Sequence, residues 1–367
     1  MSPPNLQHNY NVFLINDRFF MSTYIAHLQA FRGVAILSIV AAHAWSFAIF
    51  WTGDLDSFNL KALFYLTELF FHGSTIYFAI ISGLLFSKVL HNRGWILFYK
   101  SKTLNVVLPY SVASIIATAV YWQYYLADAV KNDISFISTV SINLVFGTAA
   151  IQFWYIPILF VLFILTPFLD FVNKHAPRLM FVFACVPLII SRSAFPDFLT
   201  MQSLVYFCGA YCFGMIIGSH YEKTMAQVNQ YKTWLVAFLV LISIAIVTQY
   251  INEYKIDGWY SSRQTLFYIQ KILACLLLLK WLQSIETRLP KTICNIGEYS
   301  FSIYFYHVLF VGFLIMSLQD FIQSYRDVFV IGLLGIGNMI IGVGTTMVIA
   351  WLIKKIIGRH SRKLIGT

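Results

Sequence analysis

Residues 31–51 read FRGVAILSIVAAHAWSFAIFW, and this stretch decides the class of the fold. Arg32 is its only charged residue, and a helix needs about 20 predominantly apolar residues to cross a bilayer. Comparable stretches recur along the chain, so we predict about ten transmembrane helices. They cover residues 31–51, 69–90, 104–126, 154–172, 178–192, 203–220, 233–251, 266–285, 299–318 and 328–356.

The composition of the whole chain agrees with this pattern. Of its 367 residues, 59% are hydrophobic and 11% are charged, whereas soluble domains have about 25% charged residues. A soluble protein of this size could not bury so much apolar surface in one core. The sequence therefore predicts an all-α polytopic membrane protein made of one domain, residues 1–367, with a short polar N-terminal segment (1–24) and a basic C-terminal tail (354–367).

Charge predicts the orientation. If the N-terminus is cytoplasmic, most of the 25 lysines and arginines lie on the cytoplasmic side of the predicted helices, as the positive-inside rule requires. The opposite side then holds only Lys61, Lys131, Arg192, Lys255, Arg263 and Arg326. We therefore expect a multi-pass protein of the cell (inner) membrane with both termini cytoplasmic. The net charge of +10 is explained by topology, and we expect no nucleic-acid partner.

Several stretches carry local predictions. The fifth predicted span is short and Pro187 should kink it, while residues 136–150 suit a re-entrant or interfacial segment. The five cysteines show neither a disulfide framework nor a four-ligand zinc site, so we expect no metal. Two sets of glycines are expected to permit close helix packing: Gly209, Gly214 and Gly218 in the sixth span, and Gly332, Gly335, Gly337, Gly342 and Gly344 in the last.

Three titratable residues fall at membrane depth, where they are costly and usually functional. His43 follows Arg32 by 11 residues, or about 16 Å of helix, and His307 lies about 12 Å into the ninth span. The two histidines can therefore share a depth. Each is also compatible with a structural role, donating a ring hydrogen to a carbonyl. Lys271 lies nearer the outer side and could instead snorkel to the surface.

Six motifs occur in order along the chain, namely YIAHLQAFRGVAILSIVAAHAW (24–45), IYFAIISGLLF (76–86), FYKSKTLNVVLPY (98–110), FWYIPILFVLFILTPFL (153–169), YFCGAYCFGMIIG (206–218) and GEYSFSIYFYHVLFV (297–311). Together they resemble the membrane acyltransferase-3 family, whose members move acetyl or related acyl groups onto sugars. Arg32, Gly33 and His43 match the spacing of the family's opening motif. Gln29 replaces the acid usual before the arginine, and Asn105 replaces a second arginine of the basic loop. The chain resembles the membrane-only type.

The resemblance implies acyl transfer from a cytoplasmic acyl-CoA, most simply acetyl-CoA, to a hydroxyl of a carbohydrate or glycolipid acceptor. Histidine, with an unperturbed pKa of about 6.5, suits the general base, so we expect His43 to take that role, with a transient acyl carrier as the alternative. His307 would orient the acceptor, or relay or donate a proton. Arg32 would bind an anionic part of the donor or fix the cytoplasmic end of the site. Three further basic residues are assigned to the donor phosphates, although positive-inside residues would look the same: Arg93, Lys100 and Lys102.

Four residues are assigned to the substrate: Ser82, Trp154, Tyr155 and Lys271. Trp154 and Tyr155 would stack on a sugar, although they would also suit interface anchors. The main alternative is a transporter or flippase for a lipid-linked sugar or polysaccharide, since that class also carries intramembrane histidines and Pro-interrupted helices. A third alternative is a subunit that only scaffolds polysaccharide synthesis. The acceptor, the acyl group and the oligomeric state do not follow from the sequence.

Overall fold

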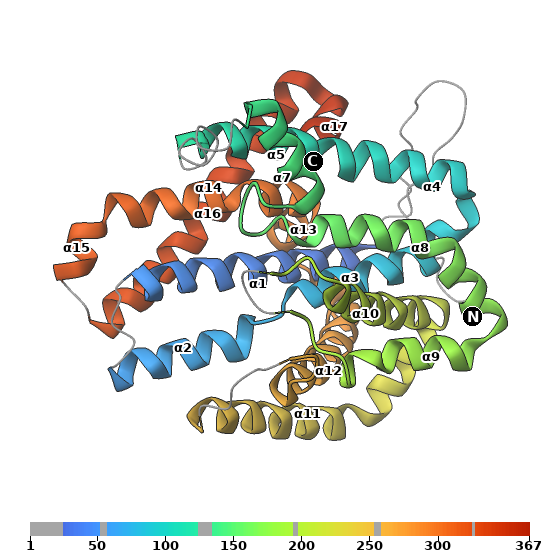
Figure 1. The fold of residues 1–367 in the computed structure, drawn as a ribbon. Helices are drawn as coiled ribbons and strands as arrows, with labels where there is room; N and C mark the ends of the chain where they lie inside the picture. The colour runs from blue at the N-terminus through green and yellow to red at the C-terminus, as the bar shows by residue number, and fades with distance from the viewer. Residues whose placement is uncertain (1–24, 52–56, 124–133, 194–196, 253–257, 325–326) are drawn as a thin grey trace, which may run out of the picture.

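The computed structural model describes residues 25–51, 57–123, 134–193, 197–252, 258–324 and 327–367 (Figure 1). Every regular element in these ranges is a helix, and nine helical segments there are long and apolar enough to cross a membrane. The chain is therefore an all-α polytopic membrane protein, as predicted. The polar segment 1–24 lies outside the described residues.

Seven of these segments are single helices, namely α1 (Ala26–Trp51), α8 (Tyr155–His175), α10 (Met201–Ser219), α11 (Tyr221–Ile251), α12 (Ser262–Ser284), α14 (Ser300–Ser317) and α16 (Val328–Ile357). Asn59–Arg93 combines α2 (Phe58–Phe71), α3 (Thr75–Leu85), the π-helical turn η1 (Phe86–Leu90) and the 3-10 turn η2 (His91–Arg93). Trp95–Val120 combines α4 (Trp95–Lys102), the π-helical turn η3 (Thr103–Val107) and α5 (Leu108–Val120). The shorter elements are α7 (Phe136–Phe146), α9 (Pro177–Cys185), η4 (Val186–Leu188), η5 (Glu286–Arg288), α13 (Lys291–Glu298), α15 (Gln319–Ser324), η6 (Gly358–His360) and α17 (Ser361–Ile365).

The structure differs from the prediction at the fifth span, residues 178–192. Helix α9 ends at Cys185 and continues only as the 3-10 turn η4, which contains Pro187. Together they cover about 18 Å at 1.5 Å per residue, well short of a hydrocarbon core of about 30 Å. Proline lacks the N–H that would extend the helix, so the helical part of this stretch is shorter than predicted. The 11-residue helix α7 is likewise too short to cross, as expected for residues 136–150.

Helix α1 occupies the middle of the bundle and packs against α2, α3, α12, α13, α14 and α16 (Figure 1). Its closest approach is to α13, because Gly33 and Gly297 face each other's backbones. A Cβ atom on Gly33 would collide with the carbonyl oxygen of Ile293, and one on Gly297 with that of Gln29. This glycine contact brings the start of α1 against the α13–α14 junction and thereby positions Arg32.

The predicted glycine packing is confirmed in the sixth span and only partly in the last. A Cβ atom on any of the three α10 glycines would collide with neighbouring residues, and α3 contributes Gly83 to the same contact. In α16, Gly335 packs on Trp45 and Gly342 on Val311. The remaining α16 glycines face open space and do not serve helix packing: Gly332, Gly337 and Gly344.

Candidate functional site

The structure brings His43 of α1 and His307 of α14 together. Their ring centroids are 5.4 Å apart and the ring planes are inclined by 47°. His307 is fully buried, whereas His43 is half-buried. The two imidazoles therefore form a pair in which one ring is enclosed by protein and the other is accessible.

Hydrogen bonding determines which nitrogen of His307 carries the proton. Its Nδ1 lies 2.7 Å from the carbonyl oxygen of Ile303, which can only accept, so Nδ1 is the protonated nitrogen of the neutral ring. Its Nε2 is buried and has no hydrogen-bond partner among the described residues. Nδ1 therefore donates the ring hydrogen to a carbonyl, which is the structural role that the sequence allowed for His307. The lone pair of Nε2 remains unused.

Two buried amides adjoin the pair. Gln152 donates to the carbonyl of Phe305, two residues before His307, at 3.1 Å. Asn338 of α16 donates at 3.5 Å to the carbonyl of Ala44, the residue after His43. In the part of the chain that the structure describes, the side-chain oxygens of both amides lack a donor. Two buried acceptors thus remain unpaired on amides that bind the backbone segments carrying the two histidines.

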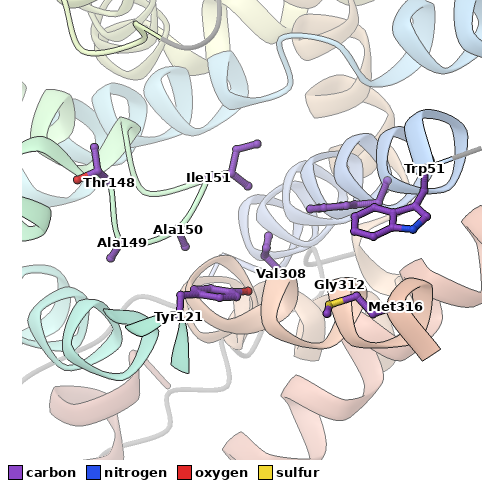
Figure 2. A pocket seen from close by; sticks show the side chains of 10 residues that line it. Trp51, Tyr121, Thr148, Ala149, Ala150, Ile151, Val308, Gly312 and Met316 are labelled. Carbon is purple, nitrogen blue, oxygen red and sulfur yellow. The ribbon is translucent and has the colours of Figure 1, made fainter. Parts of the chain in front are cut away.

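A pocket of about 300 Å³ is lined in part by residues that lie close in sequence to the two histidines, although neither histidine lines it (Figure 2). Phe47 is four residues after His43 and therefore on the same face of α1, and Val308 directly follows His307. The pocket is mostly apolar and includes two aromatic rings, those of Trp51 and Tyr121. Its lining comprises Phe47, Trp51, Tyr121, Thr148, Ala149, Ala150, Ile151, Val308, Gly312 and Met316.

None of the four residues assigned to the substrate lines this pocket. The ring of Trp154 stacks on Phe198 at 4.8 Å, and Tyr155 is buried against Phe207. Both rings are therefore occupied by protein neighbours. Ser82 is half-buried on α3, beside the glycine that packs on α10.

Lys271 lies in a different polar cluster, where α2 ends and α3 begins. It is 2% exposed, and its Nζ donates to the carbonyl of Phe70 at 2.9 Å, so it does not snorkel to the surface. Nearby, Glu68 pairs with Nδ1 of His72 at 2.6 Å and accepts a 2.8 Å hydrogen bond from Tyr250. Arg192, from the chain after α9, donates to Nε2 of His72 at 2.9 Å.

We call Glu68, His72, Arg192 and Lys271 the ionic network. Of these four residues, only Lys271 was predicted from the sequence to belong to a functional site. His72 falls within the predicted span 69–90, and Glu68 precedes it by four residues, a spacing that places both on one helix face. That signal was available in the sequence. The contact with Arg192 was not, because it depends on α9 ending early.

The start of α1 carries a second charged region. The guanidinium of Arg32 donates to Ser300 Oγ at 2.7 Å and to Gln29 Oε1 at 3.2 Å, and it lies 5.6 Å from the Phe301 ring centroid. Gln29, which stands where an acid is usual, thus still holds Arg32. Because both partners are neutral, they leave the positive charge of Arg32 uncompensated.

The structure separates the three basic residues assigned to the donor. Lys102 turns inward, with its Nζ 4.4 Å from the ring centroid of Phe163, and its charge interacts with that of Arg32. Lys100 is exposed and Arg93 is half-buried at the end of η2. Asn105 donates to the backbone and side chain of Ser101 in its own helix, at 2.8 and 3.1 Å. Of the three basic residues assigned to the donor, Lys102 is therefore the one whose charge interacts with that of Arg32.

The comparisons with known proteins give one match. A family model described as an acyltransferase domain, the acyltransferase-3 model, matches residues 25–355. No curated protein and no solved structure matches the chain. Within the described ranges, no group of three or more His, Cys, Asp or Glu side chains is arranged to hold a metal ion.

Proposed function

We propose that this chain, which belongs to the acyltransferase-3 family, transfers an acyl group from acyl-CoA to a hydroxyl of a carbohydrate or glycolipid acceptor. Acetyl is the simplest acyl group for this role. The observation that carries the proposal is the pairing of His43 with His307, whose ring centroids are 5.4 Å apart. A neutral imidazole with a free nitrogen is the group that general-base acyl transfer requires.

The reaction assigns a role to each histidine. The acceptor hydroxyl oxygen attacks the thioester carbon, and His43, the more accessible ring, takes the hydroxyl proton. The carbon–sulfur bond then breaks, and the proton passes from His43 to the departing thiolate, which leaves as coenzyme A. His307, whose ring is enclosed by protein next to His43, would relay the proton through its free Nε2. The only products are the ester and the free thiol, so the step needs no redox partner.

The acceptor enters through the pocket. The rings of Trp51 and Tyr121 offer apolar faces for a sugar ring or for the apolar part of a glycolipid. The unpaired oxygens of Gln152 and Asn338 offer acceptors for sugar hydroxyls near the two histidines. These features support a polyhydroxylated acceptor more than they support a purely apolar one.

The donor approaches from the opposite end of α1. The offset of 11 residues from Arg32 to His43 corresponds to about 16 Å of helix, so phosphate binding and chemistry are well separated. Coenzyme A is such a donor, because its phosphates and its thioester lie at opposite ends of a long arm. The positive-inside pattern of the sequence supports a cytoplasmic location for the Arg32 end and for both termini, in the inner membrane. The acceptor would then be acylated at or across the membrane.

Transfer of labelled acetyl groups by purified protein in nanodiscs tests the proposal. Acetyl-CoA labelled in the acetyl group is supplied together with a glycolipid and polysaccharide extract of the host membranes. We expect labelled product with the wild type and at least a hundredfold slower labelling with His43→Ala, in line with general-base contributions of about 10²–10⁴. His175→Ala is the matched control, because His175 is exposed at the end of α8.

Two results would overturn the proposal. Transfer by His43→Ala at the wild-type rate would remove the base from the mechanism. A wild type that translocates a lipid-linked sugar across reconstituted vesicles and produces no labelled ester would instead establish the transporter alternative.

A further inference from the structure

The basic C-terminal tail folds back onto the bundle. After α16, the turn η6 leads into helix α17, which packs against α5, η3, α14 and α16. The hydroxyl of Ser302 on α14 donates to the carbonyl of Ile365 at 2.5 Å, and Ser361, Ile365 and Thr367 are buried. The tail is therefore a docked part of the fold, at the end of the bundle where α1 begins.

This docking brings Arg362 to Arg32 and Lys102. Helix α17 contacts η3, the turn that directly follows Lys102. It also adjoins Phe301, which lies beneath the Arg32 guanidinium, since a Cβ atom on Gly366 would be 2.9 Å from Phe301 Cβ. The charges of the three basic residues interact with one another. Three segments far apart in the sequence thus converge on one cationic cluster.

The protein neutralises this cluster only in part. Among the described residues, no carboxylate lies within 4 Å of Arg32, Lys102 or Arg362. Glu298 acts on Arg32 and Arg362 from farther away, but it already pairs with Lys354 at 2.6 Å. Bringing like charges together costs free energy unless an anion binds between them.

The arrangement differs from that of ordinary positive-inside residues, whose side chains extend into water. Lys100 and Lys355 are of that kind, since both are exposed. Lys102, by contrast, turns inward over an aromatic ring, and Arg32 is held between two neutral side chains. Arg362 keeps an exposed surface, so a ligand from the aqueous phase can reach the cluster.

We infer that Arg362, carried by the docked tail, completes with Arg32 and Lys102 a binding site for the phosphate groups of the acyl-CoA donor. A guanidinium from one side and an ammonium from another suit a group with several phosphate oxygens. The identity of the polyanion rests on the proposed function. The convergence of the three cations rests on the structure alone.

Binding of coenzyme A to the purified full-length protein in nanodiscs tests this inference by titration calorimetry. We expect Arg362→Ala to raise the Kd about tenfold, the effect of losing one charge-assisted contact, and Arg362→Lys to raise it less. Lys355→Ala removes the same charge from the exposed end of α16 and should leave the Kd unchanged. Pantetheine, which lacks the nucleotide phosphates, serves as a second probe that should bind Arg362→Ala and the wild type equally.

The outcomes separate this inference from the proposed function. If the wild type does not bind coenzyme A, the proposed donor is wrong. If Arg32→Ala weakens binding and Arg362→Ala does not, the donor stands and the role of the tail is wrong. If Arg362→Ala weakens coenzyme A and pantetheine equally, the tail has only a structural role and the inference is overturned.

Discussion

Replacing Gly33 by alanine tests how the glycine contact positions Arg32. A Cβ atom on Gly33 would lie 2.3 Å from the carbonyl oxygen of Ile293, whereas a comfortable carbon–oxygen contact is about 3.3 Å. The obstacle is backbone, so α1 and α13 must separate by about 1 Å. Overpacking of this kind costs about 1–3 kcal/mol of stability. Ser300, at 2.7 Å from Arg32, would then be out of reach.

The consequence for activity follows from the same displacement. A misplacement of about 1 Å can lower a rate by about a hundredfold, so we expect Gly33→Ala to lower both the unfolding temperature and the transfer rate. Gly332→Ala is the matched control, since a Cβ atom there meets nothing within 4 Å. Alanine at that half-buried helical site should stabilise by up to about 1 kcal/mol. Equal unfolding temperatures for the two variants, measured by thermal unfolding in detergent, would refute this reasoning.

Two further predictions concern the ionic network and the pocket. Glu68→Ala leaves buried cations unpaired and should lower the free energy of unfolding by about 3–5 kcal/mol. Glu222→Ala breaks an exposed pair with Lys88 and should cost less than about 1 kcal/mol, so similar losses in denaturant titrations would contradict the assignment. Gly312→Leu adds a side chain at the pocket lining, where a Cβ atom meets nothing within 4 Å. It should raise the KM for the acceptor several-fold and leave the Kd for coenzyme A unchanged; an unchanged KM would place the acceptor elsewhere.

The sequence predicted the architecture well because each helix that crosses a bilayer must be apolar and must pair its backbone groups within itself. Backbone groups in hydrocarbon must be paired within the helix, so apolar length alone identifies most transmembrane helices. The fifth span was the exception. There, Pro187 interrupts the helix, and Arg192 reaches a polar network that hydropathy does not reveal.

The sequence also predicted that the two histidines can lie at a similar depth. Helical rise gave His43 and His307 similar depths, and the structure places their rings 5.4 Å apart. Neither the free Nε2 of His307 nor the pocket could be predicted. Both depend on a hydrogen bond and on side chains that pack around the pair.

By itself, then, the sequence determined the helical membrane fold and predicted a shared depth for the two histidines, because both depend on distances along single helices. Only the tertiary structure decided which polar residues meet. It moved Lys271 into the ionic network, separated Lys102 from Lys100, and brought Arg362 from the tail to Arg32. Such contacts join segments that are distant in the chain, and their geometry depends on how whole helices pack. The motif spacing identified His43 as the candidate general base, and helix packing brought His307 next to it.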